Sequence, residues 1–573
     1  MKLLKHLRLA ILLFVIAVVL AWTTRAGHAQ ESGPVRVDAD SPTITGLLVD
    51  PQGQPVTSAL VELMWEDHSE AITETESQPS GAYILQVPAE ALEAGRLSVL
   101  IERPHFEPVH YQLSGEDLAD LQANNTFALP TTTLEWRITL AFWIATFAFV
   151  GVLAFIALEV LHNTLAALTG VAIVFASSYL GGAVSDELFI FNFERALTYI
   201  DWEVVFLIMG MMIVIAVVEG SGIFGWLAYF AYRVSRGKSW LLVVVLMFIT
   251  GVASAFLDNV ATMLLMAPIT IQIALALEMN PLPLLIPEVL ASNVGGIATL
   301  VGTPTNILIG SFADISFAAF LINLTPGVLM AMVALVIYVE LVYFRAYRKA
   351  AAVAPPGLEK LLRERAQITA PEELKKAGWV GLGMLILFLF GERIHLTAAV
   401  TALLGATALL VWIRPDVDKM IEAVDWTTLV FFMGLFMIVG AIQEVGLLAW
   451  ITTVVARIVG TNLMLAMILI VWVGAFMSMA VDSIPFTAAM LPVVGFLSNQ
   501  IPGAEDKMLF FALAVGAAMG GNGTLIGSLP NLVTAGIAER AGYPITYGTF
   551  LKYGLPATIV TLSFGTLWLL IRF

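Results

Sequence analysis

The chain has 573 residues, of which 59% are hydrophobic and 13% charged, and it contains no cysteine. Apolar runs near 20 residues in length follow one another from about Ile138 to Phe573, and such runs match the hydrocarbon core of a bilayer. This composition predicts a multi-pass membrane protein and excludes disulfides and thiolate metal sites. The net charge of −16 is concentrated in residues 31–130, so a basic nucleic-acid-binding surface is not expected.

The first segment, residues 1–30, combines basic residues with an apolar run. Lys2, Lys5 and Arg8 precede that run, and the small-residue sequence ending at Ala29 resembles a cleavage site. This pattern predicts a signal peptide cleaved after Ala29 or, alternatively, an uncleaved signal anchor. Both alternatives place the residues that follow outside the cytoplasm.

Residues 34–130 are predicted to form a separate extracytoplasmic β domain. Alternating runs such as Ile44–Val49 and Tyr83–Val87 indicate strands, and proline- and glycine-containing turns separate them. The sequence TGLLVDPQGQPVTSALVEL, followed by SGAYILQV, resembles the transthyretin-like (carboxypeptidase-regulatory-like) β-sandwich. The domain shows no catalytic constellation, so we expect a folded external cap or a module that binds a ligand or partner.

The membrane part is predicted to consist of two halves, residues 136–344 and 378–573. Residues 345–377 separate them and carry eight lysines and arginines, which favours a cytoplasmic position for this linker. The basic loop Arg233–Lys238 is expected on the same side of the membrane.

The two halves contain an internal repeat. The sequence DWEVVFLIMGMM, which begins at Asp201, returns 224 residues later as DWTTLVFFMGLF, which begins at Asp425. The same spacing of 224 residues relates Asp258 to Asp482. Two acidic residues therefore occupy matching positions, and each lies within a long apolar context.

A second, glycine-rich segment repeats as well. GGIATLVGTPTN, from Gly295, aligns with GGNGTLIGSLPN, from Gly520, after a slip of one residue. The number of membrane passages and the basic loops place Asp201 outside the cytoplasm and Asp425 inside it. Matching segments of opposite orientation form an inverted repeat, which typically holds substrate and coupling ions near the bilayer midplane.

Asp258 and Asp482 are the strongest functional candidates. A carboxylate within lipid is costly unless it is paired, hydrated or protonated. Such a group can exchange a proton for a hard cation, because hard cations prefer oxygen ligands. We therefore predict both residues as ligands of Na⁺, although a structural role as a helix N-cap is the alternative.

Polar residues near these acids extend the candidate site, and neutral oxygens of this kind can complete a cation's ligand shell. The alternative for the glycine-rich segments is close helix packing through small residues. His162 and Glu444, at helix ends, are expected at the membrane interface. The predicted binding residues besides the two acids are Asn259, Ser292, Asn293, Thr303 and Asn306 in the first half and Ser483, Asn522, Thr524, Ser528 and Asn531 in the second.

The motifs Leu257–Asn259, Ser292–Gly296 and Gly302–Asn306 resemble those of the ion transporter superfamily. The likeness is closest to the arsenite-efflux carriers and sodium/proton antiporters with a citrate-transporter-like domain, and the order of segments is similar to that of the melanosomal P protein branch. This resemblance implies two inverted repeats with re-entrant hairpins, a homodimer and elevator-like motion. Dicarboxylate relatives carry a Ser-Asn-Thr signature, whereas this chain has Ser292–Val294 and Gly521–Gly523, which disfavours carboxylate transport.

The sequence thus predicts an all-α polytopic membrane protein with inverted repeats and re-entrant hairpins, preceded by a small extracytoplasmic β-sandwich domain. The expected function is a secondary transporter of the plasma (inner) membrane, not an enzyme, that exchanges Na⁺ or another cation for H⁺ by alternating access without another cofactor. A permease for arsenite or another small anion is the main alternative. An intramembrane aspartyl protease is more distant, since its Gly-x-Gly-Asp signature is absent, and a non-transporting receptor is the last possibility.

Overall fold

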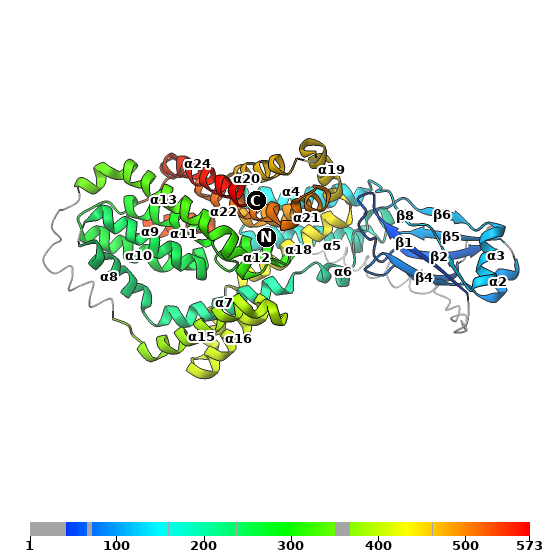
Figure 1. Cartoon of the computed structure of the whole chain (residues 1–573), viewed down its shortest axis with the longest axis horizontal. Coiled ribbons are helices and arrows are strands. Elements are labelled where there is room, and N and C mark those ends of the chain that lie inside the picture. The colour runs from blue at the N-terminus through cyan, green and yellow to red at the C-terminus, as the bar shows by residue number, and fades with distance from the viewer. Residues whose placement is uncertain are drawn as a thin grey trace, which may run out of the picture. The chain divides into compact units, whose positions relative to one another are not determined.

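A computed structural model describes residues 42–65, 71–94, 96–158, 160–236, 238–349, 367–460 and 462–573. The predicted signal segment, residues 1–30, and the central part of the predicted linker lie outside the described residues. The chain divides into two compact units, Met1–Arg137 and Ile138–Phe573, each with its own hydrophobic core (Figure 1).

The N-terminal unit contains two four-stranded sheets. In the first, β1 pairs antiparallel with β4 and parallel with β7 and β8, and in the second the strand order is β3-β2-β5-β6. Alternate side chains of β2 and β5, such as Val61 and Val99, are buried in the core of this unit. The strands and short helices are β1 (Thr43–Val49), β2 (Leu60–Trp65), β3 (Ala71–Glu76), β4 (Ala82–Gln86), α2 (Ala89–Ala94), β5 (Leu97–Glu102), β6 (Val109–Gln112), α3 (Gly115–Asn124), β7 (Thr126–Ala128) and β8 (Thr132–Thr133).

The second unit is helical, and among the described residues ten helices are long and apolar enough to cross a membrane. Its first half comprises α4 (Leu140–Ala157), α5 (Asn163–Phe175, continued by the π-helix Ala176–Gly181), α6 (Phe193–Thr198), α7 (Trp202–Gly220), α8 (Ile223–Ser235), α9 (Ser239–Phe256), α10 (Asn259–Ala276), α11 (Leu282–Gly296), α12 (Pro304–Phe312) and α13 (Phe317–Lys349). Its second half comprises α15 (Pro371–Phe390), α16 (Ala398–Ile413), α17 (Val417–Glu422), α18 (Trp426–Glu444), α19 (Leu447–Val459), α20 (Leu463–Ala480), α21 (Ser483–Gln500), α22 (Met508–Gly520), α23 (Leu529–Arg540) and α24 (Tyr547–Arg572).

The two halves pack as counterparts of one another. Helix α5 of the first half packs against α18 of the second. Their repeat counterparts, α16 of the second half and α7 of the first, also pack against each other. Likewise α10 packs against α23 and α21 packs against α12, while α13 and α24 pack against each other. Each half therefore completes the other, as expected for two interlocked repeats.

The equivalent helices α7 and α18 run in opposite directions. Tyr199, just before α7, donates a hydrogen bond to Glu444, the last residue of α18, and Arg195 Nε lies 2.6 Å from Glu444 Oε1. The start of α7 thus lies beside the end of α18, which confirms the inverted repeat. Glu444 ends the candidate span α18, and it is buried and ion-paired, because Arg195 and Tyr199 supply the partners that its burial requires.

Helices α9 and α10 form a hairpin, called hairpin 1 here. Helices α9 and α11 run parallel, since Thr250 Oγ1 donates to Glu288 Oε1 at 2.9 Å and Thr299, just after the end of α11, donates to the carbonyl of Ala255 near the end of α9. The chain leaves α9 at Asp258 but enters α11 beside the start of α9. Helix α10 must therefore return antiparallel to α9, with Asp258 at the turn.

The second half repeats this arrangement in hairpin 2, formed by α20 and α21. Helices α20 and α22 are parallel, because Gly516 lies against Val471 and Thr524 Oγ1 donates to the carbonyl of Met479 at 2.7 Å. Helix α21 accordingly returns from Asp482 to the start of α22. Three of the ten long apolar helices, α9, α10 and α20, are thus hairpin arms rather than separate crossings.

Candidate functional site

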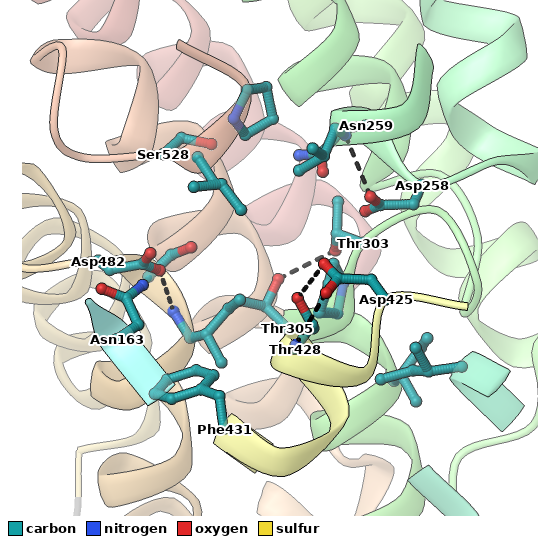
Figure 2. A pocket seen from close by; sticks show the side chains of 18 of the residues that line it. Asn163, Asp258, Asn259, Thr303, Thr305, Asp425, Thr428, Phe431, Asp482 and Ser528 are labelled. Atoms are coloured by element: carbon teal, nitrogen blue, oxygen red, sulfur yellow. Dashed lines mark hydrogen bonds between the residues drawn. The ribbon is translucent and has the colours of Figure 1, made fainter. Parts of the chain in front are cut away.

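A cavity of about 180 Å³ lies where the tips of the two hairpins approach each other (Figure 2). Ile208, Met211 and Ile215, from α7, line its apolar side, and the starts of α5 and α18 line another part, so the cavity extends from the middle of one candidate span to the ends of two others. Asp258 and Asp482 lie on opposite sides of it. Its polar lining residues are His162, Asn163, Thr164, Asp258, Asn259, Thr303, Thr305, Asp425, Thr427, Thr428, Asp482, Ser483 and Ser528.

Both acids cap the helix that follows them. Asp258 Oδ2 accepts a hydrogen bond from the backbone N–H of Val260 at 3.2 Å, and Asp482 Oδ1 accepts one from that of Ile484 at 3.0 Å. The capping role is therefore real, but it uses one oxygen of each carboxyl group. Asp258 Oδ1 is buried and finds no hydrogen-bond partner within the described residues.

Four of the helix N-termini at the cavity belong to α10, α12, α21 and α23. Helices α10 and α21 begin after the two acids, while α12 and α23 begin after Thr303 and Ser528, which also line the cavity. Each helix N-terminus carries a partial charge of about +0.5. Four of them offset roughly two negative charges, so they stabilise the carboxylates of Asp258 and Asp482 without a basic side chain.

Six of the twelve predicted binding residues line this cavity: Asp258, Asn259, Thr303, Asp482, Ser483 and Ser528. They come from both repeats, and the inverted arrangement brings them to one place. Their role in binding an ion stays a prediction.

Other predicted residues form a buried asparagine network behind the cavity. Asn293 Nδ2 donates to Asn522 Oδ1 at 2.8 Å and to Asn531 Oδ1 at 3.0 Å, which joins the two repeats. Asn293 Oδ1 in turn accepts from Asn259 Nδ2 at 3.0 Å and from Ser528 Oγ at 3.3 Å. Asn259 and Ser528 thus connect the network to the cavity lining.

Asn306 and Asn531 satisfy backbone carbonyls where α11 and α22 end. Asn306 Nδ2 donates to the carbonyl of Thr299 at 2.7 Å, and Asn531 Nδ2 donates to the carbonyls of Gly521 and Thr524 at 2.8 and 2.9 Å. A broken helix within a membrane protein needs such partners because lipid supplies none.

Two further predicted residues, Thr524 and Ser292, are not part of the cavity lining. Thr524 is buried, and its hydroxyl donates to the carbonyl of Met479. Ser292 is fully buried, and its hydroxyl finds no partner in the described part of the chain. Ser292, Asn293, Asn306, Asn522, Thr524 and Asn531 are absent from the cavity lining, so the structure gives them a position behind it.

The sequence prediction missed the start of α18 as part of the site. Asp425 accepts from the backbone N–H of Thr428 at 3.1 Å and from the Thr428 hydroxyl at 2.6 Å, and it lines the cavity between the two hairpin tips (Figure 2). Its repeat counterpart, Asp201, caps α7 and does not line it. The shared Asp-Trp motif marked both residues, but nothing in the motif distinguishes them.

The start of α5 also lines the cavity, with His162, Asn163 and Thr164. His162 is exposed, and its Nδ1 accepts from the backbone N–H of Thr164 at 3.3 Å; its expected position at the membrane interface stays a prediction. Among the described residues that line the cavity, none is a lysine or an arginine.

A second cavity, of about 540 Å³, is lined by the repeat counterparts of these residues. His395 and Thr397 at the start of α16 correspond to His162 and Thr164, and Glu203 at the start of α7 corresponds to Thr427. Because the repeats are inverted, the starts of α7 and α16 lie toward the opposite side of the membrane from the starts of α18 and α5.

Comparison with known proteins identifies relatives of the membrane unit. Residues 153–516 match the sequence profile of a family described as citrate transporter. A 46 kDa membrane protein of Mycobacterium leprae is 36% identical over 433 residues, which cover 75% of this chain and 98% of the relative. The human P protein is 33% identical over 505 residues, covering 75% of this chain but only 59% of that longer protein.

The fold has a relative among solved structures. The YdaH transporter of Alcanivorax borkumensis aligns with a TM-score of 0.50 and 15% sequence identity, covering 72% of this chain and 98% of the transporter. At this identity, the likeness shows a shared fold.

Proposed function

The chain belongs to the citrate transporter family and is a multi-pass membrane transporter, and we propose that it exchanges Na⁺ or a similar cation for H⁺. The observation that carries this proposal is the shared cavity. Asp258 and Asp482, one from each repeat, line it together with hydroxyl and amide groups. Oxygen ligands of this kind suit a hard cation, and the same carboxylates can bind protons instead.

In this mechanism Asp258 and Asp482 bind the cation and protons alternately. Asn259, Thr303, Ser483 and Ser528 supply neutral oxygens from the lining of the same cavity. The inverted repeat provides the route for alternating access, since the cavity near His395 occupies the equivalent position toward the other side of the membrane.

Citrate itself fits the cavity poorly. A tricarboxylate would meet the carboxylates of Asp258, Asp425 and Asp482, and no lysine or arginine of the described lining would offset the repulsion. We therefore propose a small cation as the transported species, despite the description of the family.

A small anion or neutral acid such as arsenite is the second candidate. The four helix N-termini around the cavity favour negative charge, and once Asp258 and Asp482 are protonated their charge no longer offsets these termini. In that case the two acids carry protons only.

We place the turn between α7 and α8 in the cytoplasm. The backbone N–H of Thr369, at the end of the linker, donates to the carbonyl of Ser221 at 3.0 Å, so both segments lie on one side. The neighbouring residues include Arg233, Lys375 and Lys376, which favour the cytoplasmic side. The β unit then lies outside the cytoplasm. Because related ion transporters often form homodimers, we also propose a homodimer for this chain.

The proposal is tested in everted vesicles that hold a proton gradient. We expect addition of Na⁺ or Li⁺ to collapse the gradient, and Asp258→Asn and Asp482→Asn each to abolish this response. Asparagine is as good an N-cap as aspartate, so both variants should fold and insert.

Asp201→Asn is the matched control, because Asp201 caps α7 away from the cavity. It should retain the wild-type response. A wild-type protein that ignores both cations but releases arsenite would favour the second candidate, and normal exchange in both acid variants would contradict the assigned roles.

A further inference from the structure

Another buried acid, Glu288, lies outside the cavity. It belongs to α11 and is 0% exposed, enclosed between that helix and the two arms of hairpin 1. It does not line either cavity described above. The position that corresponds to Glu288 in the second repeat is occupied by Leu513, so the acid is specific to the first repeat.

Two threonine hydroxyl groups lie near this carboxyl group. Thr250 Oγ1, on α9, donates to Glu288 Oε1 at 2.9 Å. Thr270, on α10, is buried and is the other hydroxyl-bearing side chain near the group. Within the described residues, Glu288 Oε2 and Thr270 Oγ1 each lack a hydrogen-bond partner.

On α13, which packs against α11, Glu340 is half-buried and its Oε1 has no hydrogen-bond partner within the described residues. On the same helix, the Tyr347 hydroxyl donates to the carbonyl of Pro283, in the first turn of α11, at 2.7 Å, and the ring of Tyr343 packs against that of Tyr553 of α24. On α23, Arg540 is exposed and lines a surface pocket. Helix α22 consists of apolar residues and glycines. In the described part of the chain no ion pair involves Glu288.

This environment suits a neutral carboxyl group and not a carboxylate. A buried carboxylate without a counter-charge is unstable, because two hydroxyl groups do not replace its hydration. A protonated group needs one acceptor for its O–H and one donor for its carbonyl oxygen. Thr270 Oγ1, which is unpartnered, can accept from Oε2–H, and Thr250 already donates to Oε1.

We propose that Glu288 is a proton-binding site and that its protonated carboxyl group ties both arms of hairpin 1 to α11. The proton is the ligand, and Thr250 and Thr270 hold the carboxyl group in position. Release of this proton requires water or a cation to reach the carboxyl group, and therefore requires hairpin 1 to separate from α11. The inference does not depend on which ion the central cavity carries.

Infrared spectroscopy of the full-length protein in proteoliposomes tests the proposal directly. At neutral pH the wild type should show the carbonyl stretching band of a protonated carboxyl group, and Glu288→Gln should remove that band. Asp258→Asn and Asp482→Asn should leave it in place, which separates this site from the proposed ion site. Glu219→Gln, which removes an exposed glutamate at the end of α7, is the matched control and should also leave it in place.

A spectrum of Glu288→Gln that equals the wild type would overturn the proposal. If the infrared spectrum of the variant cannot be interpreted, the pH dependence of thermal unfolding provides a second test. Glutamate in an unfolded chain ionises near about pH 4.3, so unfolding at neutral pH should release one more proton from the wild type than from Glu288→Gln. The Tm of the wild type in detergent should therefore fall more steeply between about pH 5 and 7 than that of the variant, and equal slopes would contradict the proposal.

Discussion

At the scale of single residues, Asp201 and Asp425 have the same local role as helix N-caps but lie in different surroundings. Both follow the repeat symmetry, and both cap the helix that begins after them. Only Asp425 lines the central cavity, where Thr427 and Thr428 donate hydrogen bonds to it. Its negative charge therefore adds to that of the two hairpin acids, while the charge of Asp201 does not.

This difference predicts unequal effects of the same substitution. Asp425→Asn should weaken the apparent Na⁺ affinity in the vesicle assay by about tenfold, equivalent to about 1.4 kcal/mol of lost attraction. Asp201→Asn should leave the affinity unchanged, and both should keep the stability within about 0.5 kcal/mol because asparagine preserves the cap. Equal affinities for the two variants would exclude Asp425 from the ion site.

At the scale of the element, the close approach of α9 to α11 and of α20 to α22 sets the position of the broken helices. A Cβ atom at Gly295 would overlap the backbone of Gly251, and one at Gly520 would overlap that of Ala475. The two glycines occupy equivalent positions in the repeats. The glycine-rich segments therefore serve close helix packing, as the alternative considered from the sequence predicted, and their role in a binding site stays a prediction.

Alanine at either position should separate the paired helices. We expect Gly295→Ala and Gly520→Ala each to destabilise the membrane unit by about 1–3 kcal/mol, because backbone atoms cannot move aside as a side chain can. Gly383→Ala, in α15, is the matched control, since its added Cβ meets no atom within 4 Å. Thermal unfolding in detergent measures the difference, and unchanged stability in both variants would show that the helices can separate freely.

At the scale of the whole molecule, the chain joins two units that have separate cores. The strands of the β unit form their backbone hydrogen bonds with one another. The sheet β3-β2-β5-β6 carries several glutamates on one face. Glu62 and Glu74 are direct cross-strand partners, and Glu102 lies on the neighbouring strand. Burial, and then the carboxylates of Glu102 and Glu74, raise the pKa of Glu62.

We therefore expect residues 42–137 to fold alone and to respond to pH through Glu62. A carboxyl group whose pKa is raised in the folded state binds its proton more tightly there, so the stability falls as the pH rises through that pKa. Glu62→Gln should increase the free energy of unfolding at neutral pH by about 0.2–1 kcal/mol, and the gain should shrink in acid and at high salt. Circular dichroism during urea unfolding measures it, and a gain that persists in acid would contradict the electrostatic cause.

The sequence by itself determined the class of protein, the two repeats and the pair of hairpin acids. Lipid permits only long apolar helices with satisfied backbones, so composition and run length are sufficient to recognise a membrane protein. Inversion followed from the basic loops because charge position reports orientation. The strands of the β domain followed from alternation, since one face of each strand must be buried.

Only the tertiary structure decided which polar residues share a cavity. Asp425 joins Asp258 and Asp482 while Asp201 does not, and Asn293 lies behind the cavity, in a network with Asn522. No motif or repeat in the sequence marks Glu288, because what distinguishes it is its burial beside α9 and α10 in the folded protein. The spacing of residues along a chain fixes the face of a helix on which they lie, but the packing of distant helices determines what that face meets.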